Sequence, residues 1–253
     1  MPSLYLTREY YQAMSVQMKK LPRARFTRYY NDLFALEGLE RPSISAYMTE
    51  GQYTFVALGN AVLQPAQDIE DFSELDLFVV AYWGHEFDPD GSFGAYFAHH
   101  YGIRATSFNV CDQGILSPIT ALQIVLAYAN SGRIKNAALL CFDQRSIPVE
   151  DTFSGTLPVK NSARFLLFST EKRTTSPYKL VQATIGQQQI TWADSTALQT
   201  IIIKSGSPYC SCAELFSPLF DQTIINRSLS EMCLQVMDTE SEEQGSMLFK
   251  RIS

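Results

Sequence analysis

The sequence predicts an α/β fold with a parallel-rich sheet, in which a βαβαβ core is followed by an abbreviated second half. Two observations support this prediction. Between residues 74 and 143, three strand segments, the first and last of them continuous apolar runs, alternate with two helical segments, and the connections are short. Such runs are typical of strands buried on both faces of a parallel sheet, with crossover helices packed on it. After residue 143 the apolar runs continue with less helix between them, and no low-complexity linker divides the chain, so we expect one domain over 1–253.

The core elements follow from the apolar runs and from the turn residues at their ends. In ELDLFVVAYWG the run from Leu75 to Trp83 is interrupted only by Asp76, which indicates a buried strand. The next helix ends at Gly102, and the longer helix has Pro118 in its first turn. The expected order is strand 74–84, helix 92–102, strand 106–110, helix 117–132 and strand 136–143.

The flanking segments are assigned from weaker patterns. Residues 1–35 mix aromatic and charged side chains at loosely helical spacing, which predicts a helix before the core. Residues 212–225 also have helical character. Four further apolar runs predict strands, and the last of them is expected at an edge of the sheet: 162–170, 178–186, 198–206 and 245–253.

Composition excludes several classes of function. With 253 residues, 46% hydrophobic and 18% charged, the chain has the composition of a soluble globular protein. A net charge of −6 and a pI near 5.1 argue against a nucleic-acid partner. The start has no signal-peptide pattern and no apolar run could span a bilayer, so we expect a cytoplasmic protein that does not bind membranes. The one basic cluster indicates a solvated helix face or a surface for an acidic partner: Lys19, Lys20, Arg23, Arg25 and Arg28.

The cysteines predict neither a disulfide framework nor a metal site. There are five, an odd number, and they are scattered along the chain. The Cys210–Cys212 pair is too close for the usual zinc knuckle, and no pair of histidines has ligand spacing. We therefore expect reduced thiols, no metal and no cofactor.

Part of the sequence resembles a known family. ELDLFVVAYWG, FGAYFAHHYGI and SFNVCDQGILSPITALQIVLAYANSGRIKNAALLCFDQ are similar to the N-terminal half of the thiolase superfamily, closest to β-ketoacyl synthases. The matching features are Asp76 before an apolar strand, the short strand 107–110, a Ser-Gly pair at 131–132, and a strand ending at Asp143. The resemblance covers about residues 70–185 and implies a thiolase fold. The final GSMLFKR resembles the last strand of that fold, which implies a contracted rather than a truncated second half.

The resemblance also implies where a catalytic cysteine would stand. In the family it lies at the N-terminus of the long buried helix, where backbone N–H groups and the helix dipole lower the thiol pKa. Counted back from Ser131 the position is Ile115, and counted forward from the short strand it is Gly114, so the register stays open between them. Cys111 stands three or four residues earlier, at the end of the strand, where that activation is missing.

Other parts of the family pattern are changed as well. Ketosynthases use two histidines, or a histidine and an asparagine, from the second half, whereas the only histidines here precede the elbow: His85, His99 and His100. The family's Gly-rich GDGA turn corresponds to KNSAR at 160–164. The resemblance therefore implies a ketosynthase-like fold without the usual catalytic residues.

The first interpretation is a catalytically degenerate, half-size ketosynthase-like subunit, comparable to a chain length factor. It would pair with a full-length β-ketoacyl synthase, or with itself, and shape the acyl tunnel in polyketide or fatty-acid-type biosynthesis. The resemblance implies pairing through the strand after the nucleophile helix, at Ala138, Leu139, Leu140, Cys141 and Phe142. The expected tunnel walls are Phe108, Gln113, Gly114, Ile115 and Leu116, together with the loop 83–87, although Phe108 also fits a core position.

Three alternatives stay open. An acyltransferase or thioesterase could use Cys111 as nucleophile with His85, His99 or His100 as base. A malonyl decarboxylase could use Gln113, because chain length factors and decarboxylating ketosynthase domains carry Gln in place of the cysteine. A scaffold could recruit an acyl carrier protein through the basic residues at 19–28.

Overall fold

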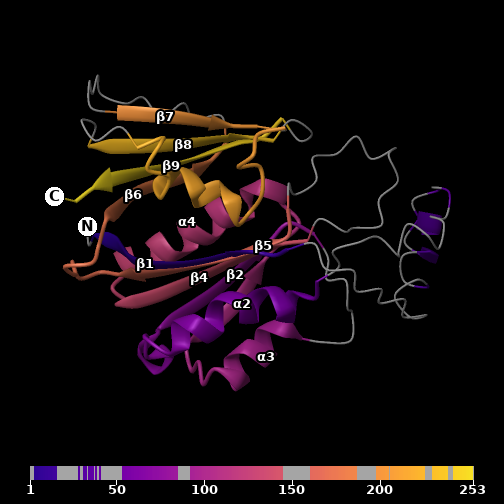
Figure 1. The fold of residues 1–253 in the computed structure, drawn as a ribbon, viewed down its shortest axis with the longest axis horizontal. Coiled ribbons are helices and arrows are strands. Elements are labelled where there is room, and N and C mark those ends of the chain that lie inside the picture. Colours follow the sequence, from indigo (N-terminus) through magenta and orange to yellow (C-terminus); the bar gives the residue numbers. More distant parts are fainter. Residues whose placement is uncertain are drawn as a thin grey trace.

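The fold is that of a computed structural model, which describes residues 3–15, 28, 31–32, 34–36, 38, 40, 53–84, 92–144, 160–186, 198–204, 206–225, 230–238 and 242–252. The strands are β1 (Leu4–Ala13), β2 (Leu77–Tyr82), β3 (Thr106–Val110), β4 (Asn136–Asp143), β5 (Ser162–Ser169), β6 (Tyr178–Ile185), β7 (Leu198–Ile203), β8 (Glu231–Met237) and β9 (Gln244–Arg251). The helices are α2 (Phe55–Gln67), α3 (Phe93–His100) and α4 (Ser117–Asn130), with short 3-10 helices η2 (Phe72–Glu74), η3 (Gly114–Leu116) and η4 (Glu214–Leu219). The described strands form one sheet in the order β3-β2-β4-β5-β1-β6-β9-β8-β7 (Figure 1).

The predicted βαβαβ core is confirmed. β2 pairs in parallel with β3 on one side and with β4 on the other, and α3 and α4 make the two crossovers. Outside this core the sheet is mixed. β7 is parallel to β8, while antiparallel pairings join β4 to β5, β5 to β1, β1 to β6, β6 to β9 and β9 to β8. The parallel character predicted for the sheet therefore lies mainly in its core.

The strand order shows that the sheet is built from two related halves. In the first half, the first to fifth strands of the chain lie in the order β3-β2-β4-β5-β1. In the second half β7, β8, β9 and β6 occupy the places of β2, β4, β5 and β1, with the same parallel and antiparallel relations. Within the described residues no strand takes the place of β3 beside β7. The predicted abbreviated second half is confirmed.

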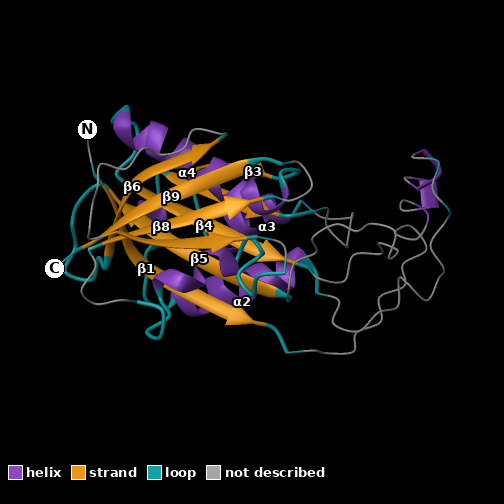
Figure 2. Ribbon diagram, turned by 90° about the horizontal axis from the view of Figure 1, so that it is seen from above, coloured by secondary structure: helices purple, strands orange, loops and turns teal. Residues whose placement is uncertain are grey.

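Helix α4 lies between the two halves of the sheet. It contacts β2 on one side and β6 and β9 on the other, while α2 and α3 cover the opposite face of the first half (Figures 1 and 2). Two buried clusters result. Leu139 of β4 packs with Leu122 of α4, whereas its neighbours Leu140 and Phe142 follow the two-residue alternation and pack with Phe55 of α2 and the other aromatic side chains on that face.

The contact between β9 and the start of α4 requires a glycine. A Cβ atom at Gly245 would lie 2.6 Å from Cδ1 of Ile119 and 3.0 Å from Cδ2 of Leu116, which is closer than a close-packed core tolerates. Gly245 therefore lets the second half pack directly against the first turn of α4.

The two faces of β8 and β9 differ in composition. Leu234 and Met247 point inward to α4. The outer face is mixed: it carries Gln235 and Ser246, which shares a 3.0 Å hydrogen bond with Thr184, and also the buried apolar side chains of Cys233 and Leu248.

Three assignments from sequence differ from the structure. Residues 4–13 form β1 rather than a helix, because a register shift between Leu6 and Arg8 interrupts the two-residue alternation and gives the apolar spacing a helical appearance. The last strand, β9, lies between β6 and β8 and not at an edge. In the segment 212–225 the helical part is η4, a 3-10 helix that contains Pro218. Strand β8 and helix α2 were not predicted.

The residues expected at a partner interface are buried inside the chain. Ala138, Leu139, Leu140, Cys141 and Phe142 are 0% exposed, and β4 pairs with β2 and β5 along both edges. That expectation is wrong, because β4 has neither a free edge nor an exposed face. The edge strand of the first half is β3. No helix within the described residues is long and apolar enough to cross a membrane.

Candidate functional site

The predicted elbow lies at the carboxyl ends of β2, β3 and β4, where the loops of parallel strands meet. β3 ends at Val110, the chain turns over three residues, and η3 leads directly into α4. Two residues of the turn have left-handed backbone conformations, Asp112 with φ 63° and Gly114 with φ 50°. Asp and Gly are among the residues that adopt this conformation most readily. The sharp strand–turn–helix geometry is therefore present.

Cys111 points away from the elbow helix. It packs against the cluster under α2 and α3, whereas Val110 before it packs with α4. Its Sγ donates to Oδ2 of Asp112 at 3.1 Å. Burial raises the pKa of the Cys111 thiol, and Asp112 raises it further, although a hydrogen bond with Tyr82 opposes them. The thiol is therefore protonated at neutral pH and lies on the wrong face of the sheet to feel the α4 dipole.

Gly114 is the elbow residue with room for a side chain. A Cβ atom there would lie 3.6 Å from Cε2 of Trp83 and 3.7 Å from Oδ2 of Asp238, which are ordinary van der Waals distances. Trp83 directly follows β2 and Asp238 directly follows β8, so the two halves of the fold face each other at this point. Ile115, in contrast, is 1% exposed and lies in the core under α4. The geometry favours Gly114 over Ile115 for the position that a nucleophile would take.

The other expected wall residues have different surroundings. Leu116 is 1% exposed and belongs to the same core as Ile115, and Phe108 is half-buried against it. Gln113 is exposed, and its Oε1 accepts a hydrogen bond from the Thr120 hydroxyl at 2.5 Å. The side-chain amide of Gln113 is therefore hydrogen-bonded to the first turn of α4 and does not point into a buried tunnel.

His99 and His100 do not form a site with Cys111. His85 lies outside the described residues, as does most of the loop 83–87. His99 and His100 are exposed at the end of α3, just before β3 begins. Because Cys111 follows the other end of β3, five strand residues, or roughly 17 Å, separate the two places. Of the basic cluster only Arg28 is described, and it is exposed next to Asp32 at 3.8 Å.

A segment of the second half closes the elbow from the side. The thiol of Cys212 donates to the Gly114 carbonyl at 3.5 Å, and the backbone N–H of Ala213 donates to Oδ2 of Asp143 at 2.8 Å. Asp143 is 1% exposed, and within the described residues its Oδ1 makes no hydrogen bond of normal geometry. Burial raises its pKa to about 6, although the N–H groups of Ala213 and Cys212 oppose the shift. Cys212 and Cys210 are also buried, and burial raises the pKa of both thiols.

The same segment is held by Arg164, which sequence analysis did not single out. The Arg164 side chain is 2% exposed; its Nε donates to the Ala213 carbonyl at 2.7 Å and one terminal nitrogen donates to the Ser217 hydroxyl at 2.6 Å. The other terminal nitrogen pairs with Glu9 of β1, and the guanidinium lies 4.3 Å from the centre of the Tyr11 ring. Burial lowers the pKa of Arg164 to about 10, so it stays charged at neutral pH.

A second charged group extends this network. Glu214 is 2% exposed and accepts from the Tyr11 hydroxyl at 2.6 Å and from the Ser217 hydroxyl at 2.9 Å. Its Oε1 also lies 3.2 Å from Nζ of Lys160. Both cations, Lys160 and Arg164, belong to the KNSAR segment that replaces the family's glycine-rich turn. This change in the turn was the one sequence signal that could have identified the network.

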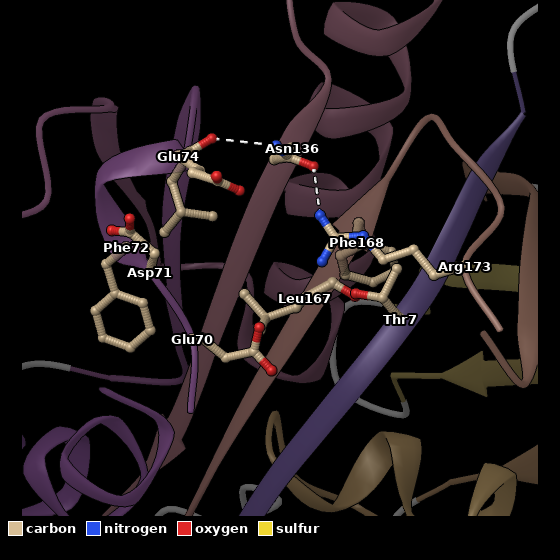
Figure 3. A pocket seen from close by; sticks show the side chains of 10 residues that line it. Thr7, Glu70, Asp71, Phe72, Glu74, Asn136, Leu167, Phe168 and Arg173 are labelled. Atoms are coloured by element: carbon tan, nitrogen blue, oxygen red, sulfur yellow. Dashed lines mark hydrogen bonds between the residues drawn. The ribbon is translucent and has the colours of Figure 1, made fainter. Parts of the chain in front are cut away.

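No group of three or more His, Cys, Asp or Glu side chains in the described part of the chain could hold a metal ion. A small cavity of about 40 Å³ lies at the opposite end of the sheet, by the start of β4 (Figure 3). There Asn136 accepts from Arg173 and donates to the Glu74 carbonyl, each at 3.2 Å. The polar groups of Asn136 are thus used within the protein, and the cavity has room for little more than water.

Comparison with solved structures identifies the fold. ChlB3, named as an acyltransferase, superposes with a TM-score of 0.67 at 9% identity, over 100% of this chain and 98% of that one. Xanthomonas campestris OleA with cerulenin bound gives 0.62 at 10% identity, over 98% and 96%. AbyA1, named as a tetronic acid condensing enzyme, gives 0.64 at 9% identity, over 98% and 99%. No family model matches the sequence, and none of the curated proteins matches it.

These structures have the thiolase fold, and the chain shares it, as the sequence resemblance predicted. Identities near 10% extend the likeness no further than the fold. Each alignment runs over nearly the whole of both chains, which agrees with contraction rather than truncation of the second half.

The buried carboxyl of Asp143 generates a pH prediction. Its pKa rises from 3.8 to about 6 on folding, so the native state binds more protons between these pH values and the free energy of unfolding falls as pH rises through them. Asp143→Asn keeps an acceptor for Ala213 without the charge. The free energy of unfolding of the variant minus that of wild type should be about 2–3 kcal/mol larger at pH 7 than at pH 4.

Urea unfolding of both proteins at the two pH values measures this difference, and titrations elsewhere cancel in the comparison. A difference that does not change with pH would show that Asp143 is not a buried carboxyl that ionises near pH 6.

Proposed function

We propose that the chain is a ketosynthase-like subunit of the thiolase fold that forms no acyl-enzyme itself and acts by pairing with an active β-ketoacyl synthase, whose acyl cavity it helps to shape. The observation that carries the proposal is Gly114. It occupies the half-buried, left-handed position of the elbow, and it has no side chain with which to attack a thioester.

The surroundings of the elbow support the same conclusion. Cys111 faces the other side of the sheet with a raised pKa, and Gln113 is bonded to Thr120. The alternatives that use either residue as the reacting group therefore have no geometric support in the described residues. Cys212 lies nearest the elbow carbonyl, but it is 0% exposed and burial raises its pKa well above the usual value.

Pairing is proposed through β3. This strand hydrogen-bonds only to β2 and forms the edge of the described sheet, and its Ser107 and Asn109 side chains are exposed. An open edge is a template for a strand of another chain. The partner would be a full-length β-ketoacyl synthase, or a second copy of this chain, and the docking of an acyl carrier protein would follow from the paired assembly.

Acylation of the isolated chain tests the first part of the proposal. Wild type incubated with a malonyl or acyl thioester should remain unmodified by intact-protein mass spectrometry. Gly114→Cys should gain a thiol that reacts with iodoacetamide at pH 7 at least about tenfold faster than Cys111, because the helix N-terminus lowers a thiol pKa by one unit or more.

Ile115→Cys is the matched control, and it should stay unreactive because that position is buried. The proposal fails if the wild-type chain alone becomes acylated on Cys111 and turns the substrate over.

Co-expression with the host's β-ketoacyl synthase tests the pairing. The two chains should co-purify, and a double change of Ser107→Lys and Asn109→Lys should abolish the complex, because two charges on an edge strand oppose strand addition. Thr200→Lys, on the other edge strand β7, is the control that should leave it intact. Native mass spectrometry reads both hetero- and self-association. Retention of the complex in the β3 variant would contradict this interface.

A further inference from the structure

A groove of about 510 Å³ lies between β6 and the second half of α4, away from the elbow. The two elements that form it are labelled in Figure 1. One stripe of α4 lines it, with side chains three and four residues apart: Gln123, Leu126, Ala127 and Asn130. From the facing strand it is lined by residues 179–183. Its volume falls within the roughly 300–1,000 Å³ typical of small-molecule sites.

The walls of the groove are largely apolar. Leu180 and Ala183 are buried beneath it, and Leu126 is half-buried. Val181 is 44% exposed, because the register of β6 against β9 shifts between Leu180 and Gln182 and leaves Val181 outside the ladder. A bulged strand therefore presents an aliphatic side chain where solvent would otherwise contact it.

The groove also carries a positive charge that no described residue compensates. Lys179 lies directly opposite Lys250 in the pairing of β6 with β9, and like charges in this arrangement repel. Lys250 has Glu231 at 3.7 Å. Lys179 makes no ion pair or hydrogen bond with any residue that the structure describes, and its long, flexible side chain can follow a ligand at the rim. The amides of Gln123 and Asn130 likewise make no hydrogen bond within the described residues.

We propose that this groove binds a linear, medium-length alkyl carboxylate. The alkyl chain lies along Leu126, Ala127 and Val181, and the carboxylate pairs with Lys179 and relieves its repulsion with Lys250. The amides of Gln123 and Asn130 lie about 10 Å apart, at the two ends of the α4 stripe, and the one nearer to Lys179 supplies a hydrogen bond to the head group. The site uses no part of the elbow and does not depend on the proposed function.

Decanoate, below its micelle-forming concentration, is the probe, and calorimetry on the purified chain measures its affinity. Saturable binding should weaken about tenfold or more in Lys179→Met, since a hydrogen bond to a charged group contributes roughly 1.5–3 kcal/mol. Ala127→Trp should abolish it by filling the groove from an exposed helical position. Lys204→Met, which removes an exposed lysine elsewhere, should bind as wild type does.

Ala127→Ser changes the same position without filling the groove, so it should bind decanoate as wild type does. Circular dichroism of every variant shows whether its fold is kept. Amide chemical-shift changes confined to α4 and β6 should report the same site in wild type. Absence of saturable binding, binding that Ala127→Trp leaves unchanged, or decanol binding as tightly as decanoate would each overturn the proposal.

Discussion

The contracted fold depends on the ion pair and hydrogen bonds that the buried guanidinium of Arg164 makes. From β5 it pairs with Glu9 of β1 and donates to Ala213 and Ser217 of the second half. A charge at 2% exposure is tolerated only when its donors are satisfied, and here the acceptors come from two segments far apart in the chain, β1 and residues 213–217. Arg164 therefore fixes the segment around Ala213, and with it the Cys212 contact that closes the elbow.

This network explains how a thiolase fold remains stable with a reduced second half. A short 3-10 helix, η4, lies where the network holds it, and charge–charge and hydrogen-bond contacts supplement apolar packing there. Gly245 brings β9 against the start of α4. The elbow itself keeps its backbone geometry. Gly114 stands at its left-handed position, and Cys111 faces the other side of the sheet.

The sequence predicted the parts of the fold that local physics determines. Strand β4 was assigned at 136–143, its observed bounds, because a strand buried on both faces has a continuous apolar run. Strand β1 was missed because a bulge disturbs its alternation, and the interior place of β9 is set by pairing order, which no local pattern records. The Arg164–Glu9 pair joins residues 155 apart in sequence, so only a structure could reveal that the KNSAR change builds a buried network.

Hydrogen exchange of Arg164→Met tests this account most directly. Removing one partner of a buried charge pair costs about 3–5 kcal/mol, and Glu9 and the Ala213 carbonyl would lose their donor. Amides of residues 211–219 should lose protection by at least tenfold, while those of β2 and β4 remain protected as in wild type. Unchanged protection of 211–219 in a folded variant would contradict the claim that Arg164 holds the second half against the elbow.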